Sequence, residues 1–158
     1  MAYFYSQRLG KLTIDQVKTQ IIKFLQSDKK SEYSFIIGSD SQKISKNKYL
    51  FVSALIVHRV GSGAIYFYQK KLVEQKLQFK ARIYNEALLS LQMAEKFLKI
   101  FSQNGFGRYN FKIHLDIGHN GKTKTLVSEI TNLIKSSGYS YEIKPNSHAA
   151  SKVADKHT

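Results

Sequence analysis

The chain has 158 residues, of which 42% are hydrophobic, a length and composition typical of one domain with its own core. It contains no cysteine, which excludes disulfides and thiolate metal sites. Lys and Arg number 25 against 11 Asp and Glu, giving a net charge of +14. This surplus favours a polyanionic partner, most commonly nucleic acid, although a lysine-rich solvated surface would give the same number.

Neither a membrane span nor a secretory signal is predicted. No apolar run approaches the roughly 18–20 residues that cross a bilayer, and the first residues lack a basic segment followed by an apolar one. We therefore expect a cytoplasmic protein without membrane association. We also expect one domain over 1–158, in which 1–32 form an arm and a helix and 33–158 form the core.

The N-terminal third predicts a helix followed by a strand meander. Residues 1–12 are aromatic and basic and suggest an arm packed on the domain. Thr13 and Gln16 form a capping-box pattern, and apolar residues then recur at helical spacing to about Gln26.

Three strands are predicted next, at 33–40, 49–59 and 64–71. The polar stretch 41–48 is interpreted as a loop, and Gly61-Ser62-Gly63 as a hairpin turn. Short connections of this kind predict antiparallel neighbours.

Helices and strands alternate in the rest of the chain. Apolar residues at helical spacing predict helices over 79–103 and 122–137, and alternating patterns predict strands over 110–117 and 139–144. A last short helix is expected from about residue 146 to the C-terminus. The two later strands should be parallel because a helix separates them.

This element order resembles that of ribonuclease H-like nucleases. The resemblance implies an α/β fold with a mixed five-stranded sheet in the order 3-2-1-4-5, counted along the chain, with helices on both faces and an extra N-terminal helix. In that fold the first and fourth strands lie side by side at the centre of the sheet.

Four acids occupy positions that this fold would bring together. Asp40 ends the first strand, Asp116 lies near the end of the fourth, Glu86 is in the first turns of the long helix, and Asp155 is on the last helix. Carboxylate oxygens suit Mg²⁺ or Mn²⁺, and two such ions about 3.5–4 Å apart serve phosphodiester hydrolysis. Taken singly, each acid has an ordinary alternative: a turn residue, a solvent-facing helix residue, a turn cap or a surface charge.

Three sequence blocks carry a more specific resemblance. They are Ile37 to Gln42, His114 to Gly118 with Asn120 to Thr123, and Lys144 to Lys156. Together they resemble the YkuK-type ribonuclease H-like family of bacteria over nearly the whole chain. The resemblance implies metal-ligand roles for Asp40, Glu86, Asp116 and Asp155.

Polar and basic residues near these acids are candidates for nucleic-acid contacts. The candidates are Gln42, Lys43, Lys46, Lys48, Asn120, Lys122, Lys124 and His148. The alternatives are a capping or packing role for His148 and ordinary solvation of the lysines.

The sequence therefore predicts a metal-dependent nuclease that cleaves RNA or DNA through a two-metal carboxylate site holding Mg²⁺ or Mn²⁺. The alternative is a non-catalytic nucleic-acid-binding module on the same fold. A nucleotide-handling protein of the actin-like kinase type is a weaker third reading, suggested by Asp116-Ile117-Gly118 and Gly121-Lys122-Thr123.

Overall fold

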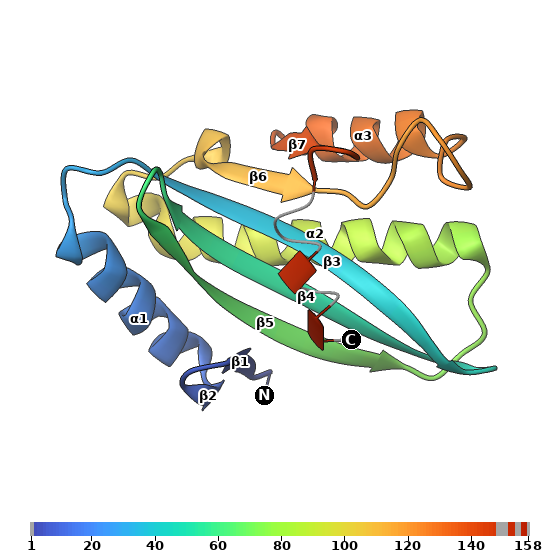
Figure 1. Ribbon diagram of the computed structural model, residues 1–158, viewed down its shortest axis with the longest axis horizontal. Helices are drawn as coiled ribbons and strands as arrows, with labels where there is room; N and C mark the ends of the chain where they lie inside the picture. Colours follow the sequence, from blue (N-terminus) through green and yellow to red (C-terminus); the bar gives the residue numbers. More distant parts are fainter. Residues whose placement is uncertain (1, 148–151, 154–155, 158) are drawn as a thin grey trace.

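A computed structural model describes residues 2–147, 152–153 and 156–157, and its centre is a mixed seven-stranded sheet (Figure 1). The strand order is β2-β1-β5-β4-β3-β6-β7. The strands are β1 (Phe4–Ser6), β2 (Gly10–Leu12), β3 (Tyr33–Ser45), β4 (Lys48–Arg59), β5 (Gly63–Val73), β6 (Phe111–His114) and β7 (Ser140–Glu142).

The helices are α1 (Ile14–Ser27), α2 (Phe79–Phe101) and α3 (Val127–Ser136), with short 3₁₀ turns η1 (Ser102–Asn104) and η2 (Arg108–Asn110). The predicted capping box at α1 is confirmed. The Thr13 hydroxyl accepts from the Gln16 backbone N–H (3.2 Å), and the Gln16 side chain accepts from the Thr13 N–H (2.8 Å). Among the described residues, no helix combines the length and the apolarity that crossing a bilayer requires.

The expected five-stranded sheet is wrong in strand number, and the complete order differs from the expected one at the β5 edge. There the N-terminal arm forms the β1–β2 hairpin, and β1 pairs with β5 through Tyr5 and Tyr68. The hairpin is anchored by Phe4, which is 1% exposed and meets the Phe97 ring edge-on at 5.5 Å. Burial of this ring explains why the arm joins the sheet.

The stretch predicted as a loop at 41–48 is mostly strand, which corrects that interpretation. β3 runs on to Ser45 and pairs with β4 over its whole length, with Ser41 opposite Phe51 and Lys43 opposite Tyr49. Cross-strand pairs of this kind extend the ladder. Asp40 therefore lies inside β3, opposite Val52, and not at the end of the strand.

The centre of the sheet is parallel, as expected for strands separated by a helix. β3 pairs with β6, and β6 pairs with β7. β6 ends at His114, earlier than the predicted limit at 117, and α3 begins at Val127 instead of 122. The intervening chain forms turns, in which the Thr123 hydroxyl accepts from the Gly118 N–H at 3.0 Å.

One hydrophobic core joins the sheet to all three helices. Phe35 of β3 stacks on Phe111 of β6 with ring centroids 4.5 Å apart and contacts Phe101 of α2 at 5.5 Å. Helices were expected on both faces of the sheet. The described part of the C-terminal tail lies on the face opposite the one that carries Phe35 and the core. Residues 152–153 and 156–157 of the tail are helical, and His157 stacks on Tyr68 with ring centroids 3.9 Å apart.

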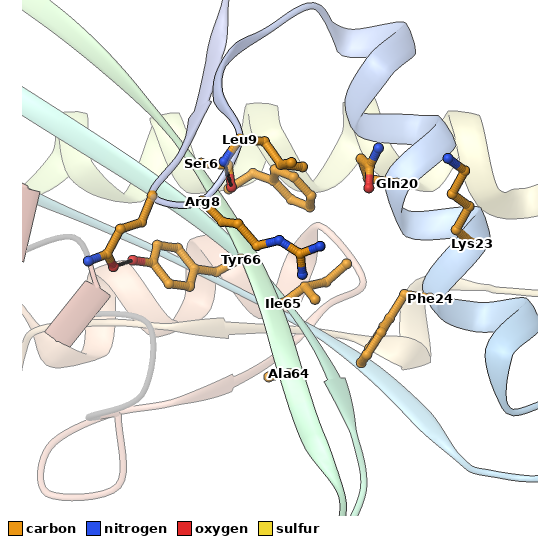
Figure 2. A pocket seen from close by; sticks show the side chains of 11 residues that line it. Ser6, Arg8, Leu9, Gln20, Lys23, Phe24, Ala64, Ile65 and Tyr66 are labelled. Carbon is orange, nitrogen blue, oxygen red and sulfur yellow. Dashed lines mark hydrogen bonds between the residues drawn. The ribbon is translucent and has the colours of Figure 1, made fainter.

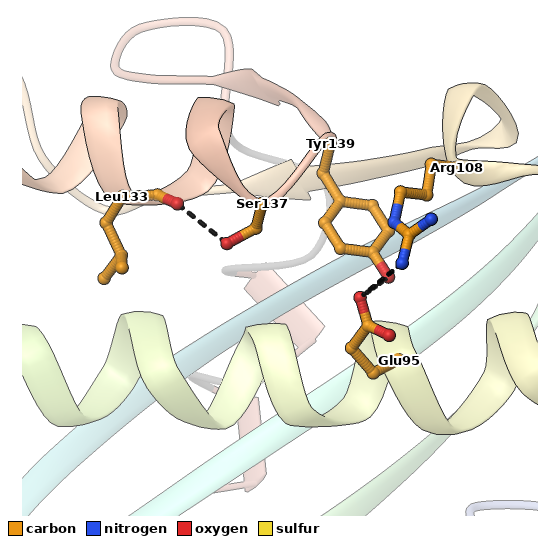
Figure 3. A network of polar contacts seen from close by, with 5 residues as sticks. All are labelled: Glu95, Arg108, Leu133, Ser137 and Tyr139. Carbon is orange, nitrogen blue, oxygen red and sulfur yellow. Dashed lines mark hydrogen bonds and ion pairs between the residues drawn. The ribbon is translucent and has the colours of Figure 1, made fainter.

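A hydrogen bond from Tyr139, just before β7, and an ion pair from Arg108 both reach Glu95 of α2 (Figure 3). The Tyr139 hydroxyl donates to Glu95 Oε1 at 2.6 Å, and Arg108 Nη2 lies 3.5 Å from the same oxygen. The Ser137 hydroxyl donates to the Leu133 carbonyl at 2.9 Å and closes the end of α3. Burial, together with the bond to Glu95, raises the pKa of Tyr139, so this phenol stays a neutral donor.

Candidate functional site

The sheet brings Asp40 and Asp116 toward each other. The parallel ladder between β3 and β6 ends with Gly38 opposite His114. Two residues further along each segment come Asp40, which is still in β3, and Asp116, which lies in a bend just beyond β6. Both carboxylates are half-buried. Both charges act on the same Glu86 carboxyl, so the two acids lie in one region, where β6 ends and β3 continues.

The backbone beyond β6 bends at Asp116 but stays hydrogen-bonded to β7 and to the residues after it. Leu115 donates to the Glu142 carbonyl at 2.9 Å, and Lys144 donates to the Ile117 carbonyl at 2.8 Å. These bonds fix the segment that carries Asp116. The Lys144 ammonium lies 3.1 Å from Asp116 Oδ1 and partly neutralises that carboxylate.

Glu86 reaches the same region from α2, and its side chain is only 8% exposed. Ser41 Oγ donates to its Oε2 at 2.5 Å. Burial raises the pKa of Glu86 to about 8, and the nearby charges of Asp40 and Asp116 add to the rise, while the Ser41 bond and the Arg82 charge oppose it. The protonated form of Glu86 is therefore favoured at neutral pH.

Arg82 organises the carboxylate of Glu86 indirectly. Its Nε donates to Ser41 Oγ and its Nη2 to the Ser41 carbonyl, both at 2.6 Å. The guanidinium also lies over the Tyr49 ring, 5.4 Å from its centroid. Sequence reasoning missed this residue, although its position one helical turn before Glu86 places both on one side of α2.

A cavity of about 10 Å³ separates α2 from the end of β6 and is lined by both Glu86 and Asp116. Hydroxyls form one side of it, since Ser39 Oγ lies 2.8 Å from Ser53 Oγ and 2.8 Å from Ser90 Oγ. Polar side chains thus continue from the acids into the interior, below the site.

The described acids lie in one region of the molecule, but they are not arranged as a preformed metal site. Within the described ranges, no group of three or more acid or histidine side chains is placed to hold a metal ion. Glu86 and Asp116 are directed instead toward Ser41 and Lys144. The predicted fourth ligand, Asp155, lies outside the described residues.

The described end of the tail lies on the same sheet face as Asp40. Tyr68 of β5 pairs across Ala54 with Gly38, two residues before Asp40 on β3. His157 stacks on this tyrosine and lies 3.3 Å from the Tyr66 hydroxyl. The tail therefore crosses β5 close to the row that contains Asp40.

Half of the predicted nucleic-acid contacts are on the hairpin that extends beyond Asp40. Gln42 and Lys43 are exposed on β3, Lys46 is in the turn, and Lys48 begins β4. The structure adds Lys70 of β5, which pairs with the same Val52 that pairs with Asp40. Sequence reasoning missed Lys70, because only the strand register reveals its relation to the acid.

The second half follows Asp116 along the chain. Asn120, Lys122 and Lys124 are exposed in the turns between β6 and α3. The Lys122 ammonium lies 5.8 Å from the centroid of the Phe79 ring at the start of α2. His148 lies outside the described residues. Basic side chains consequently flank the acids on both the hairpin and the turn side.

Comparison with known proteins decides the family. The family model described as Ribonuclease H-like matches residues 16–158. The chain belongs to the ribonuclease H-like family. This ribonuclease H-like protein is also 31% identical, over 166 aligned residues, to a Bacillus subtilis (strain 168) protein named "Uncharacterized protein YkuK", with 98% of this chain and 96% of the relative covered. The predicted resemblance to the YkuK-type family is therefore confirmed, and family membership connects the protein with nucleic acid.

Proposed function

We propose that this protein is a metal-dependent nuclease that hydrolyses phosphodiester bonds of RNA or DNA. The observation that carries the proposal is the burial of the Glu86 carboxyl, only 8% exposed, in the same region as Asp40 and Asp116. An acidic centre of this kind is costly in isolation, and a bound cation would stabilise it. Its location in a protein of net charge +14 supports an anionic substrate.

The donor set suits a hard divalent cation. Asp40, Glu86 and Asp116 offer only carboxylate oxygens, which Mg²⁺ and Mn²⁺ prefer, and Asp155 is the fourth ligand in this proposal. In phosphodiester hydrolysis such ions activate water and stabilise the leaving oxygen. Glu86 would exchange its bond to Ser41 for the cation and would lose its proton.

The basic residues around the acids would position the substrate. Lys43, Lys46 and Lys48 present ammonium groups on the hairpin beyond Asp40, while Lys122 and Lys124 do so on the turns after Asp116. An RNA or DNA strand bound across the acids would meet lysine side chains on both sides of them. Contacts of this type fix a backbone without reading its sequence.

Cleavage assays on RNA, single-stranded DNA, duplex DNA and RNA–DNA hybrid, each with Mg²⁺ and with Mn²⁺, test the proposal. Asp40→Asn and Asp116→Asn should each reduce cleavage by at least about 100-fold, because a lost carboxylate weakens the hold on the cation. Asp15→Asn, at an exposed position on α1, is the matched control and should keep full activity. Equal cleavage by Asp40→Asn and the unmodified protein would mean that any activity comes from a contaminant.

A non-catalytic nucleic-acid-binding module is the second candidate, and the partners of the acids favour it. Lys144 is paired with Asp116, and Ser41, held by Arg82, is bonded to Glu86. These contacts neutralise or satisfy the carboxylates without a metal. This reading expects salt-sensitive binding that neither a chelator nor Asp40→Asn changes, and no cleavage under any metal condition.

A further inference from the structure

A large cavity formed by described residues lies at the β5 edge of the sheet, away from the acids. It has a volume of about 560 Å³, inside the range of roughly 300–1,000 Å³ that small-molecule pockets occupy. Figure 2 shows it between α1, the turn that joins β1 to β2, and the first half of β5. Nothing in the acidic site accounts for it.

The pocket exists because the β1–β2 hairpin leaves the β5 edge. Within the described residues β1 pairs with β5 only through Tyr5 and Tyr68, so the start of β5 has no paired strand on that side. The hairpin turn then stands away from β5, where Ser6 Oγ accepts from the Leu9 N–H at 3.2 Å. Two side-chain bonds close the near end of the opening among the described residues, since Gln7 Oε1 accepts from the Tyr66 hydroxyl at 2.8 Å and from the Lys156 ammonium at 3.1 Å.

Apolar groups form the walls of this pocket. Leu9, Phe24 and Ile65 line it from the turn, from α1 and from β5 respectively (Figure 2). Leu9 is an exposed large apolar side chain, 43% accessible. The Phe24 ring already carries Arg59 with the guanidinium 4.2 Å from its centroid. A flat apolar group in the pocket would cover Leu9 and contact the Phe24 ring and Ile65.

Among the described residues, the pocket lining contains two cations and no carboxylate. Arg8 lines the pocket from the turn and Lys23 from α1 (Figure 2). Neither forms an ion pair with another side chain of the described ranges. Gln20 lies beside Lys23 and offers an amide that both donates and accepts hydrogen bonds. The pocket therefore combines an anion-binding side with an apolar side.

We propose that this pocket binds a nucleoside monophosphate. The phosphate lies between Arg8 and Lys23, the base lies against Phe24 and Ile65, and the Gln20 amide meets polar atoms of the base or sugar. Phosphate alone would use the cations and leave the apolar wall uncovered. An apolar ligand would leave the two cations without a counter-charge.

The pocket is separate from the acids, so this inference goes beyond the proposed nuclease activity. Ile65 lies in the row of Val57 and Phe35, whereas Asp40 is five residues further along β3 and two strands away from β5. At about 3.3 Å per residue and 4.8 Å per strand, the two sites are on the order of 15–20 Å apart.

Isothermal titration calorimetry with AMP and CMP tests the proposal in the Asp40→Asn background, where no substrate turnover can interfere. Saturable binding of one nucleotide per chain is expected. Arg8→Ala and Lys23→Ala should each weaken it about tenfold, because each removes a hydrogen bond to a charged group. Lys18→Ala, on the same helix but outside the pocket, should leave the affinity unchanged.

Parallel titrations with adenosine, inorganic phosphate and benzoate identify the ligand class. Adenosine and phosphate should each bind at least about tenfold more weakly than AMP, because each lacks one half of the complementary chemistry. Benzoate should also bind at least about tenfold more weakly, because its singly charged carboxylate and small ring replace the phosphate and the base only in part. Absence of saturable AMP binding would overturn the proposal. So would equal affinity for phosphate or benzoate, an unchanged affinity in an Arg8→Ala, Lys23→Ala double variant, or an equal loss in Lys18→Ala. None of these results depends on whether the protein cleaves nucleic acid.

Discussion

Glu86 is placed where its negative charge is unfavourable, which links the candidate site to stability. Its pKa rises from 4.5 to about 8, chiefly through burial. The folded protein therefore holds a proton that the unfolded chain releases between these two values. The contribution to stability is complete below about pH 4.5 and is lost as pH rises toward 8.

Glu86→Gln should remove this pH dependence. In chelator, the free energy of unfolding of the unmodified protein should fall between pH 5 and pH 8.5 by on the order of 4 kcal/mol relative to Glu86→Gln. Urea unfolding at a series of pH values measures the difference. Glu129→Gln is the control, since this exposed residue has its pKa lowered by the Tyr84 hydrogen bond and should not reproduce the trend. Parallel curves for Glu86→Gln and the unmodified protein would contradict the raised pKa.

The candidate acids could be named from the sequence, but their contacts could not. Asp40 and Asp116 followed from apolar strands that carry an acid and from the central pairing of those strands. Arg82 and Lys144 did not follow, because their partners depend on side-chain directions across elements far apart in the chain. No sequence periodicity indicates which partner a long, flexible Lys or Arg side chain will contact.

Among the elements, the β1–β2 hairpin depends on one buried ring. Phe4 is 1% exposed against the Phe97 ring, whereas the neighbouring Tyr3 is 37% exposed. Phe4→Ala should reduce the free energy of unfolding by about 3–5 kcal/mol, and Tyr3→Ala by about 1 kcal/mol or less. Chemical denaturation of both variants measures the contrast. Similar values for the two would mean that the hairpin is not packed as described.

Helices and strands were predicted correctly where the sequence pattern lies within one segment or extends over many residues. The Thr13–Gln16 capping box and the helical stripe of α2 specify their helices within the segment itself. Prediction failed for β1 and β2, which have three residues each and are too short for an alternating pattern. It also ended β3 too early, because the polar residues 41–45 continue the ladder through pairing with β4.

For the whole molecule, the charge of +14 predicts salt-dependent binding to nucleic acid. The affinity for a labelled single-stranded oligonucleotide, followed by fluorescence anisotropy, should fall linearly in a plot of log K against log salt concentration. Lys46→Ala, at the tip of the β3–β4 hairpin, should reduce the slope by about one.

Lys29→Ala is the matched control for this measurement. Lys29 is an exposed lysine in the segment between α1 and β3, away from the acids. Its substitution should change neither slope nor affinity beyond the small effect of net charge. Equal effects of the two substitutions would mean that the hairpin is not the contact surface and that binding follows net charge alone.

If Asp40, Glu86 and Asp116 bind a divalent cation, as proposed, binding should release a proton, and this release can be counted. Glu86 is mostly protonated at pH 7 and would lose that proton on coordination. Calorimetric titration of Mn²⁺ in two buffers of different ionisation enthalpy should reveal release of about one proton per protein. The release should disappear in Glu86→Gln. Binding without proton release, or no Mn²⁺ binding that depends on Asp40, would contradict the account.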